Sequence, residues 1–148
     1  MCCDQRSFLR RVLAVKWWAF ETAYAPAVLV PLWLILFRFA PRVLARMAGH
    51  KLNNGLCHQH AYVSSAALPA APFIVETLER KQPGIVADAL DMILGFLRCT
   101  DPRDGESLQW HKELRAVVLG ALPRVRQLSM CGDAEVAEMA KLVELEAG

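Results

Sequence analysis

Apolar side chains recur along most of the chain at three- and four-residue spacing, which places them on one face of an α-helix. The clearest stripe consists of Ile85, Val86, Ala89, Leu90, Ile93, Leu94 and Leu97. Helices are predicted over residues 4–24, 28–39, 41–51, a segment ending at 78, a segment opening at 83, a segment opening after 104–107, and 133–147. No segment alternates between apolar and polar positions as a half-buried strand does. The pattern therefore predicts an all-α fold.

Prolines and short polar residues mark the helix boundaries. Pro26 ends or resets the first helix, which Asp4 or Ser7 caps, and Pro41 suits the first turn of the third. Segment 53–55, Asn-Asn-Gly, is a stop signal for that third helix. Residues 57–65 are aperiodic.

The same reasoning locates the later boundaries. Pro69 and Pro72 lead into the fourth helix, and either Asp104 or Ser107 caps the sixth. Pro123 kinks or divides that sixth helix, and Asp133 is the N-cap of the last, which ends at 147.

One run, residues 22–37, is uncharged over 16 positions between Glu21 and Arg38. It is shorter than the roughly 20 apolar residues of a spanning helix, and Pro26 and Pro31 interrupt it. No small-residue cleavage site of a signal peptide follows it. We interpret it as a helix buried on most sides and expect no stable membrane insertion. Peripheral docking on a membrane through residues 8–37 is the alternative.

Composition and charge narrow the class of protein. The 148 residues, 55% of them hydrophobic, suffice for one domain with its own core, and we assign residues 1–148 to it. A net charge of +2 disfavours a nucleic-acid-binding protein. Five scattered cysteines without a secretory signal predict reduced thiols and a cytoplasmic location. Charge is unevenly distributed, with +6 over residues 1–56 and −4 over residues 57–148.

The residues with potential chemistry are few. Cys57, His58 and His60, with His50 upstream, are ligand types that zinc prefers, but no second cluster with metal-ligand spacing follows. A Cys57 nucleophile would need a histidine base and an orienting carboxylate, and the sequence places no carboxylate nearby. We expect His58 and Gln59 to hydrogen-bond the backbone between helix pairs. We therefore predict no catalytic, cofactor or metal site; a metal-binding or Cys/His-dependent enzyme or sensor is the competing interpretation.

The acidic and aromatic residues indicate which surfaces face solvent and which are candidates for binding a partner. The pairs Asp88/Asp91 and Glu76/Glu79 are typical of solvated polar helix faces. The acidic last helix is either a solubilising cap or a surface for a basic partner. Trp17 and Trp18 are neighbours, about 100° apart on a helix, so one of them is expected at an interface.

Five short motifs in residues 19–79 carry a resemblance. They are Ala23-Tyr24-Ala25, Val30-Pro31-Leu32, Leu56-Cys57-His58-Gln59, Tyr62-Val63-Ser64-Ser65-Ala66 and Ala71-Pro72-Phe73-Ile74. This segment, about two fifths of the chain, resembles the front of a bacterial HEAT-repeat family that includes cytoplasmic proteins encoded beside toxins. The sequence departs from the family at Ala25 and His60, where the family carries Gly.

The resemblance implies a short HEAT-like α-solenoid of about three helix pairs. It further implies an immunity protein, which binds a cognate bacterial toxin or effector and occludes its active site without catalysis. A general protein-interaction scaffold, and a homodimer formed through the apolar N-terminal helices, are open alternatives. We predict that the partner-binding residues are Tyr62, Glu76, Glu79, Asp88, Asp91, Trp110, Glu135 and Glu138.

Overall fold

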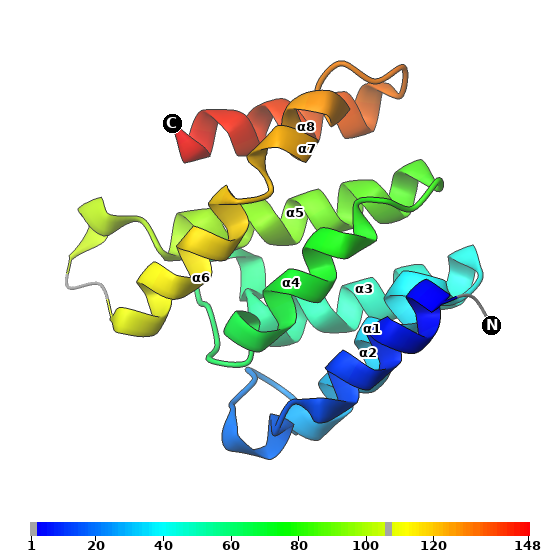
Figure 1. Cartoon of the computed structure of the whole chain (residues 1–148). Helices are drawn as coiled ribbons and strands as arrows, with labels where there is room; N and C mark the ends of the chain where they lie inside the picture. The colour runs from blue at the N-terminus through cyan, green and yellow to red at the C-terminus, as the bar shows by residue number, and fades with distance from the viewer. Residues whose placement is uncertain (1–2, 106–107) are drawn as a thin grey trace.

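The protein is all-helical throughout the part that the computed structural model describes, residues 3–105 and 108–148, and no strand occurs there (Figure 1). The α-helices are α1 (Cys3–Ala14), α2 (Val30–Phe39), α3 (Arg42–Leu56), α4 (Ala67–Thr77), α5 (Pro83–Cys99), α6 (Gln109–Leu119), α7 (Leu122–Leu128) and α8 (Ala134–Ala147). Short 3-10 turns are η1 (Trp17–Ala19), η2 (Ala27–Leu29), η3 (His58–His60) and η4 (Pro102–Asp104). The predicted all-α class is confirmed.

The helices pack in two layers. In the front layer α2 contacts α4, and α4 contacts α6; in the back layer α3 contacts α5, and α5 contacts α8 (Figure 1). Between the layers α2 packs on α3, α4 on α5, and α7 on α8. Helix α1 joins the front layer through Phe8, whose ring lies edge-on to Phe39 and Phe73 at 5.1 Å from each.

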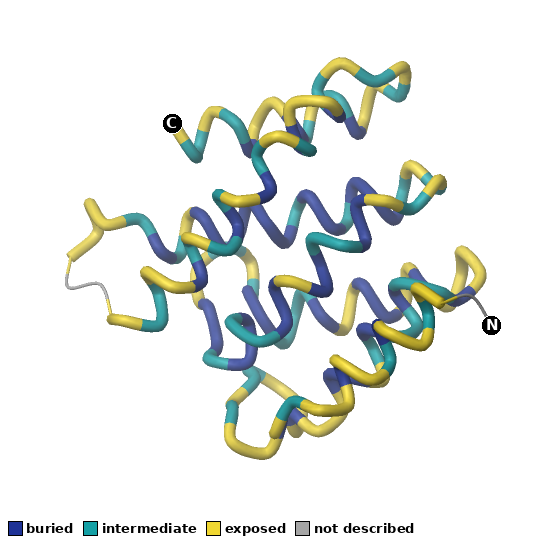
Figure 2. The backbone as a smooth tube through the Cα atoms, in the orientation of Figure 1, coloured by how far each residue is buried: buried dark blue, intermediate teal, exposed yellow. Residues whose placement is uncertain are grey.

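Helix α5 lies at the centre of the core. Its stripe is buried as predicted, and Ala87, Met92 and Phe96 on its flanks are buried too. In Figure 2 the buried colouring is concentrated on α5 and the helices next to it. A helix with neighbours on three sides buries more than one face, which explains why its apolar stripe is so wide.

Most boundaries follow the predicted signals. Pro83 opens α5, and Pro123 divides the sixth predicted helix into α6 and α7. Asp133 is the N-cap of α8, because its Oδ1 accepts the Val136 N–H at 3.0 Å. Pro72, expected before the fourth helix, lies inside α4.

The predicted first helix is too long. Helix α1 ends at Ala14 rather than at position 24, and the chain continues through η1 and η2. The buried Trp17 indole donates to the Val12 carbonyl at 2.8 Å, so this side chain folds back onto α1 rather than extending its stripe. Its neighbour Trp18 is 73% exposed, as expected for two tryptophans that cannot share a face.

Two other boundaries are also wrong. Helix α3 continues through Asn53 and Gly55 to Leu56, because the Asn53 side chain bonds Asp91 on α5 instead of capping its own backbone. Asp104 belongs to η4 and does not cap α6, which begins at Gln109; Ser107, the other predicted cap, lies outside the described residues.

The apolar run is unevenly buried. Val30, Leu34 and Phe37 enter the core, whereas Val28 and Leu32 are 53% and 47% exposed. The expectation of a helix buried on most sides holds for α2, where Leu32 alone among residues 30–39 is exposed, but not for residues 24–29, which are exposed except for Ala27. Among the described residues, no helix is both long and apolar enough to cross a membrane.

Candidate functional site

Polar side chains line a groove on the back layer, which we call the polar groove. It consists of three adjoining hollows of about 360, 130 and 360 Å³ that run across α3 and α5 to the start of α8. Its lining side chains include Arg42, Arg46, His50, Asn53, Asn54, Gln59, His60, Gln82, Asp88, Asp91 and Glu135.

A sharp corner closes one end of the groove. After α3 ends at Leu56, Gln59 and His60 adopt left-handed backbone with φ of 50° and 56°. Glycine adopts this conformation at least cost, and neither of these residues is glycine.

Gly95 lets this corner reach the backbone of α5. A Cβ at position 95 would lie 2.8 Å from His60 Cδ2 and 3.0 Å from Cys57 Sγ. Because Gly95 has no side chain, the corner packs directly against the backbone of α5.

Cys57 is not arranged as a nucleophile. Its thiol is fully buried and donates to Asn53 Oδ1 at 3.2 Å. Burial, followed by the nearby Cys99 and Asp91, raises its pKa far above the ordinary range. The thiolate form of Cys57 is therefore strongly disfavoured. Reactive-cysteine chemistry, which needs the thiolate, is disfavoured for the same reason.

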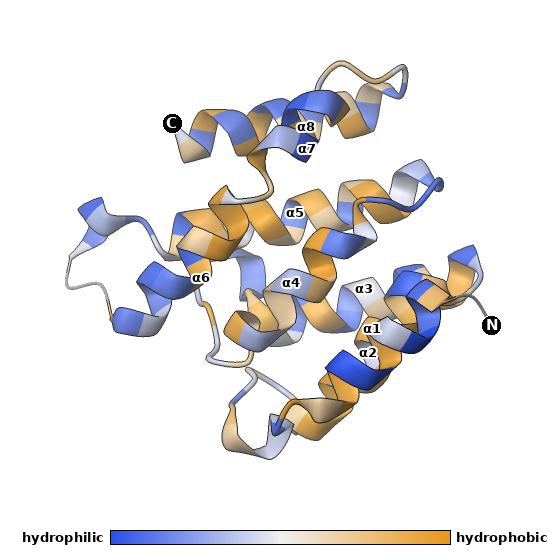
Figure 3. Cartoon of the chain, viewed as in Figure 1, coloured by the Kyte–Doolittle hydropathy of each residue, from blue (hydrophilic) through white to orange (hydrophobic). Residues whose placement is uncertain are grey.

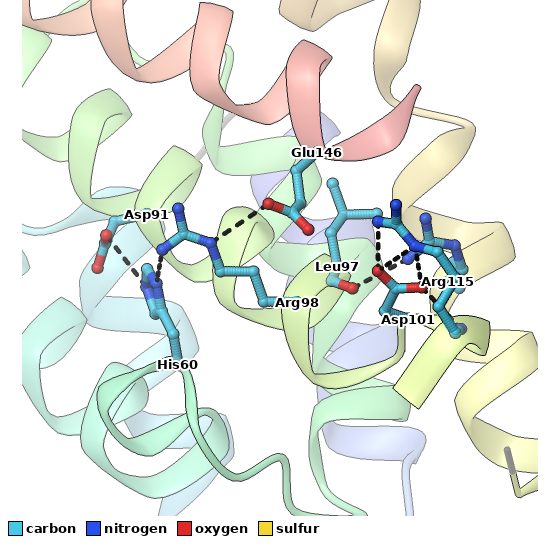
Figure 4. Close-up of polar contacts among 8 residues, drawn as sticks. His60, Asp91, Leu97, Arg98, Asp101, Arg115 and Glu146 are labelled. Atoms are coloured by element: carbon cyan, nitrogen blue, oxygen red, sulfur yellow. Dashed lines mark hydrogen bonds and ion pairs between the residues drawn. The ribbon is translucent and has the colours of Figure 1, made fainter. Parts of the chain in front are cut away.

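His60 connects three helical elements through a chain of polar contacts (Figure 4). Arg98 Nη1 lies 3.0 Å from Nδ1, and Asp91 Oδ1 lies 3.2 Å from Nε2. Because a guanidinium only donates, this geometry requires the Nε2–H tautomer, which donates to Asp91. Arg98 Nε extends the chain to Glu146 on α8 at 3.4 Å.

Asp91 is the centre of this network. Besides the His60 contact it accepts from Asn53 Nδ2 at 2.8 Å. The His60 hydrogen bond is the largest cause that lowers the Asp91 pKa, and Asn53 adds to it against the opposing effect of burial. The carboxylate is thus held ionised and oriented inside the groove.

Asp88, one turn earlier on α5, is held by a different cation. Arg46 of α3 donates to both carboxylate oxygens at 3.0 Å. Burial nevertheless raises the Asp88 pKa, with Arg46 acting in the opposite direction and the Glu135 carboxylate adding to the rise. Glu135 itself lines the groove at the start of α8.

His58 points to the opposite side of the corner. Its Nε2 lies 3.0 Å from the Tyr24 hydroxyl, and the two rings meet edge to face at 5.0 Å. This contact ties the corner to the segment before α2. His58 and His60 therefore bind different partners and do not converge on one point.

The predicted acid pairs are not simply solvated, which corrects that interpretation. Besides Asp88 and Asp91, Glu76 receives both Arg11 Nη atoms at 2.6 and 2.9 Å, and Glu79 pairs with Arg124 at 3.2 Å. A helix pattern cannot reveal these partners, because each lies at least 31 positions away in sequence.

The eight predicted partner-binding residues divide between the layers. Asp88, Asp91 and Glu135 line the polar groove, and Glu138 is exposed one turn after Glu135 on α8. The other four lie elsewhere: Glu76 and Glu79 at the end of α4, Tyr62 in the segment after η3, and Trp110 on α6.

The two aromatic candidates differ in exposure. Tyr62 is 53% exposed, whereas Trp110 is partly buried against the core and its ring meets His111 edge-on at 4.1 Å. Trp110 is therefore a packing residue in this structure.

Sequence reasoning missed Arg46 and Asn53, which hold the groove acids, and Arg98, which holds His60. No local signal identifies them, because their partners are on other helices. For Arg46 the one sequence trace is the net charge of +6 over residues 1–56 against −4 over residues 57–148.

Within the described chain, no group of three His, Cys, Asp or Glu side chains is placed to hold a metal ion. Comparison with known proteins adds no relative: no family model, no curated protein and no solved structure matches this chain. The fold and the site define an all-helical protein with a preformed polar groove on one layer.

Proposed function

We propose that this protein is a non-catalytic binding module that recognises another protein through the polar groove. The observation that carries the proposal is the internal hydrogen bonding of the groove. Arg46, Asn53 and His60 hold Asp88 and Asp91 in fixed positions before any partner arrives. A preorganised surface loses little conformational entropy on binding, so more of its interaction energy becomes affinity.

The arrangement of helices supports a HEAT-like array of three pairs. The pairs would be α2–α3, α4–α5, and α6–α7 with α8, with one helix of each pair in each layer. In such arrays one layer offers a continuous binding surface built from successive repeats. The polar groove crosses α3, α5 and α8, one helix from each of these pairs.

We further propose, on the resemblance of residues 19–79, that the partner is a bacterial toxin or effector that the protein neutralises by covering its active site. The partner-binding residues that this proposal favours are Glu135 and Glu138 of α8, which form no ion pair with any described residue. Charges at the rim of an interface chiefly accelerate association and exclude wrong partners.

The test is co-expression of the tagged full chain with the product of the neighbouring gene, followed by capture, size-exclusion chromatography and a growth assay. The expected result is a one-to-one complex and rescue of growth. Neighbour products that are harmless and do not bind would contradict the toxin assignment.

A matched pair of variants tests whether the acids of α8 belong to the partner-binding surface. Glu135→Lys with Glu138→Lys reverses two charges on α8, and Asp104→Lys with Glu113→Lys reverses two on η4 and α6. We expect association to slow by about tenfold or more in the first variant only, in keeping with electrostatic steering. Equal rates in the two variants would exclude the α8 acids from the interface.

A further inference from the structure

Beyond the groove, the outer side of the α2–α3 pair exposes apolar side chains, and we call it the outer face. Helices α4 and α5 cover the other side of this pair. The outer face comprises Val28, Leu29, Leu32, Val43, Leu44 and Met47, which are 38–81% exposed. On α2, Leu32 points about 160° away from the buried Leu34, and on α3, Val43 and Met47 are one turn apart.

Exposed aromatic residues adjoin this face. Trp18 in η1 is 73% exposed, and η1 contacts η2, which supplies Val28 and Leu29. Tyr24 is 68% exposed and borders a hollow of about 250 Å³ that Leu29 and Lys51 also line. Tryptophan and tyrosine combine an apolar ring with a polar tip, which suits the boundary between water and lipid.

The cations of this region are largely uncompensated. Arg6, Arg10, Lys16, Arg42 and Lys51 form no ion pair within residues 3–105 and 108–148, and residues 1–56 carry a net charge of +6. A second copy of this chain docked face to face would bring like charges together. An anionic surface would neutralise them.

We propose that the outer face docks this protein on the surface of an anionic lipid bilayer. Trp18, Leu32 and Val43 enter the headgroup region, and Lys16 and Lys51 meet the lipid phosphates. Buried apolar area together with attraction to anionic lipid is the combination that holds peripheral proteins on membranes. An acidic protein partner is the competing occupant, which the vesicle experiment below distinguishes.

The experiment is flotation of the purified full chain with vesicles of phosphatidylcholine alone or mixed with phosphatidylserine. We expect flotation only with the mixed vesicles, and less of it as salt rises, because salt screens the attraction. One basic residue near such a surface contributes about fivefold to binding, so Lys16→Glu with Lys51→Glu should lower the bound fraction at least tenfold.

Two more variants separate the apolar contribution to vesicle binding from the contribution of charge. Trp18→Glu with Leu32→Glu should abolish flotation while circular dichroism stays unchanged, because both side chains are exposed. Met130→Glu, at an 82% exposed position between α7 and α8, adds a negative charge elsewhere and should float like the wild type.

Three outcomes would overturn the proposal: a wild-type chain that stays unbound with mixed vesicles at low salt, equal flotation of the lysine variant, or equal loss in Met130→Glu. A dimer in size-exclusion chromatography that Leu32→Glu dissociates, without vesicle binding, would assign the face to a second copy instead. None of these results depends on whether a toxin binds the polar groove.

Discussion

Helices α2 and α5 are both strongly apolar, as Figure 3 shows, but they have different numbers of neighbours. Helix α5 lies between α3 and α8, and α4, α6 and η3 also pack on it, whereas the helices that α2 contacts are α1, α3 and α4. As a result α5 buries residues around most of its circumference, and α2 leaves Leu32 and the adjoining Val28 in solvent. Apolar content therefore reports how much surface a helix can bury, and its place in the fold decides how much it does bury.

Among the substitutions considered, Leu90→Ala on α5 is expected to lower the free energy of unfolding most. Leu90 is completely buried, and removing its side chain leaves a cavity between packed helices. We expect the free energy of unfolding to fall by about 2–5 kcal/mol. Urea denaturation followed by circular dichroism measures it, and a loss below about 1 kcal/mol would contradict the central position of α5.

A smaller loss of unfolding free energy is expected from Gly95→Ala, also on α5. The new Cβ would press on His60 and Cys57, which are held by other contacts, so the corner must shift. Overpacking of this kind costs about 1–3 kcal/mol.

Gly132→Ala is the matched control for that substitution. Nothing lies within 4 Å of a Cβ at position 132 in the turn before α8. Its effect on unfolding should stay within about 0.5 kcal/mol. Equal losses in the two variants would show that the corner does not depend on close contact with α5.

Asp91→Asn tests the polar side of α5 through its pH dependence. Because the folded state lowers the Asp91 pKa, the ionised carboxylate stabilises the fold above its ordinary value of 3.8, and the stabilisation is lost as the pH falls below that value. We expect a loss of about 1–2 kcal/mol at neutral pH, reduced because the site is half exposed.

The loss should shrink as unfolding is repeated at progressively lower pH through 3.8. It should also be smaller when His60 is already replaced by Ala, since the two residues share the interaction. A loss that is the same at every pH would assign the effect to packing rather than to charge.

The parts of the fold that could be predicted depend on local chemistry. Pro83 and Pro123 set boundaries through their own rings, and Asp133 caps α8 with its own side chain. The ends of α1 and α3 could not be predicted, because distant contacts decide them. Asn53 remains helical because a carboxylate 38 positions later accepts its amide hydrogen.

The candidate site, like the fold, has parts that local sequence predicts and parts that depend on distant contacts. Cys57 and His60 are noticeable in sequence because these residue types rarely cluster, and they do lie at the corner. Their roles depend on Arg98 and on the space above Gly95, which no local pattern contains. The groove acid Asp91 was also identified, but as a solvated residue, since its partners belong to other elements.

The smallest effect on folding is expected from Leu32→Gln on α2. Because Leu32 is half exposed on the outer face, replacing it with a polar residue of similar length removes little buried surface. The free energy of unfolding should change by no more than about 0.5 kcal/mol, against several for Leu90→Ala. A loss above about 2 kcal/mol would mean that the outer side of α2 is covered in solution by a second copy of the chain, and this loss would grow with protein concentration. A near-zero change with unchanged folding would instead leave the outer face of α2 available for an interaction outside the fold, which is the condition that docking on a lipid surface requires.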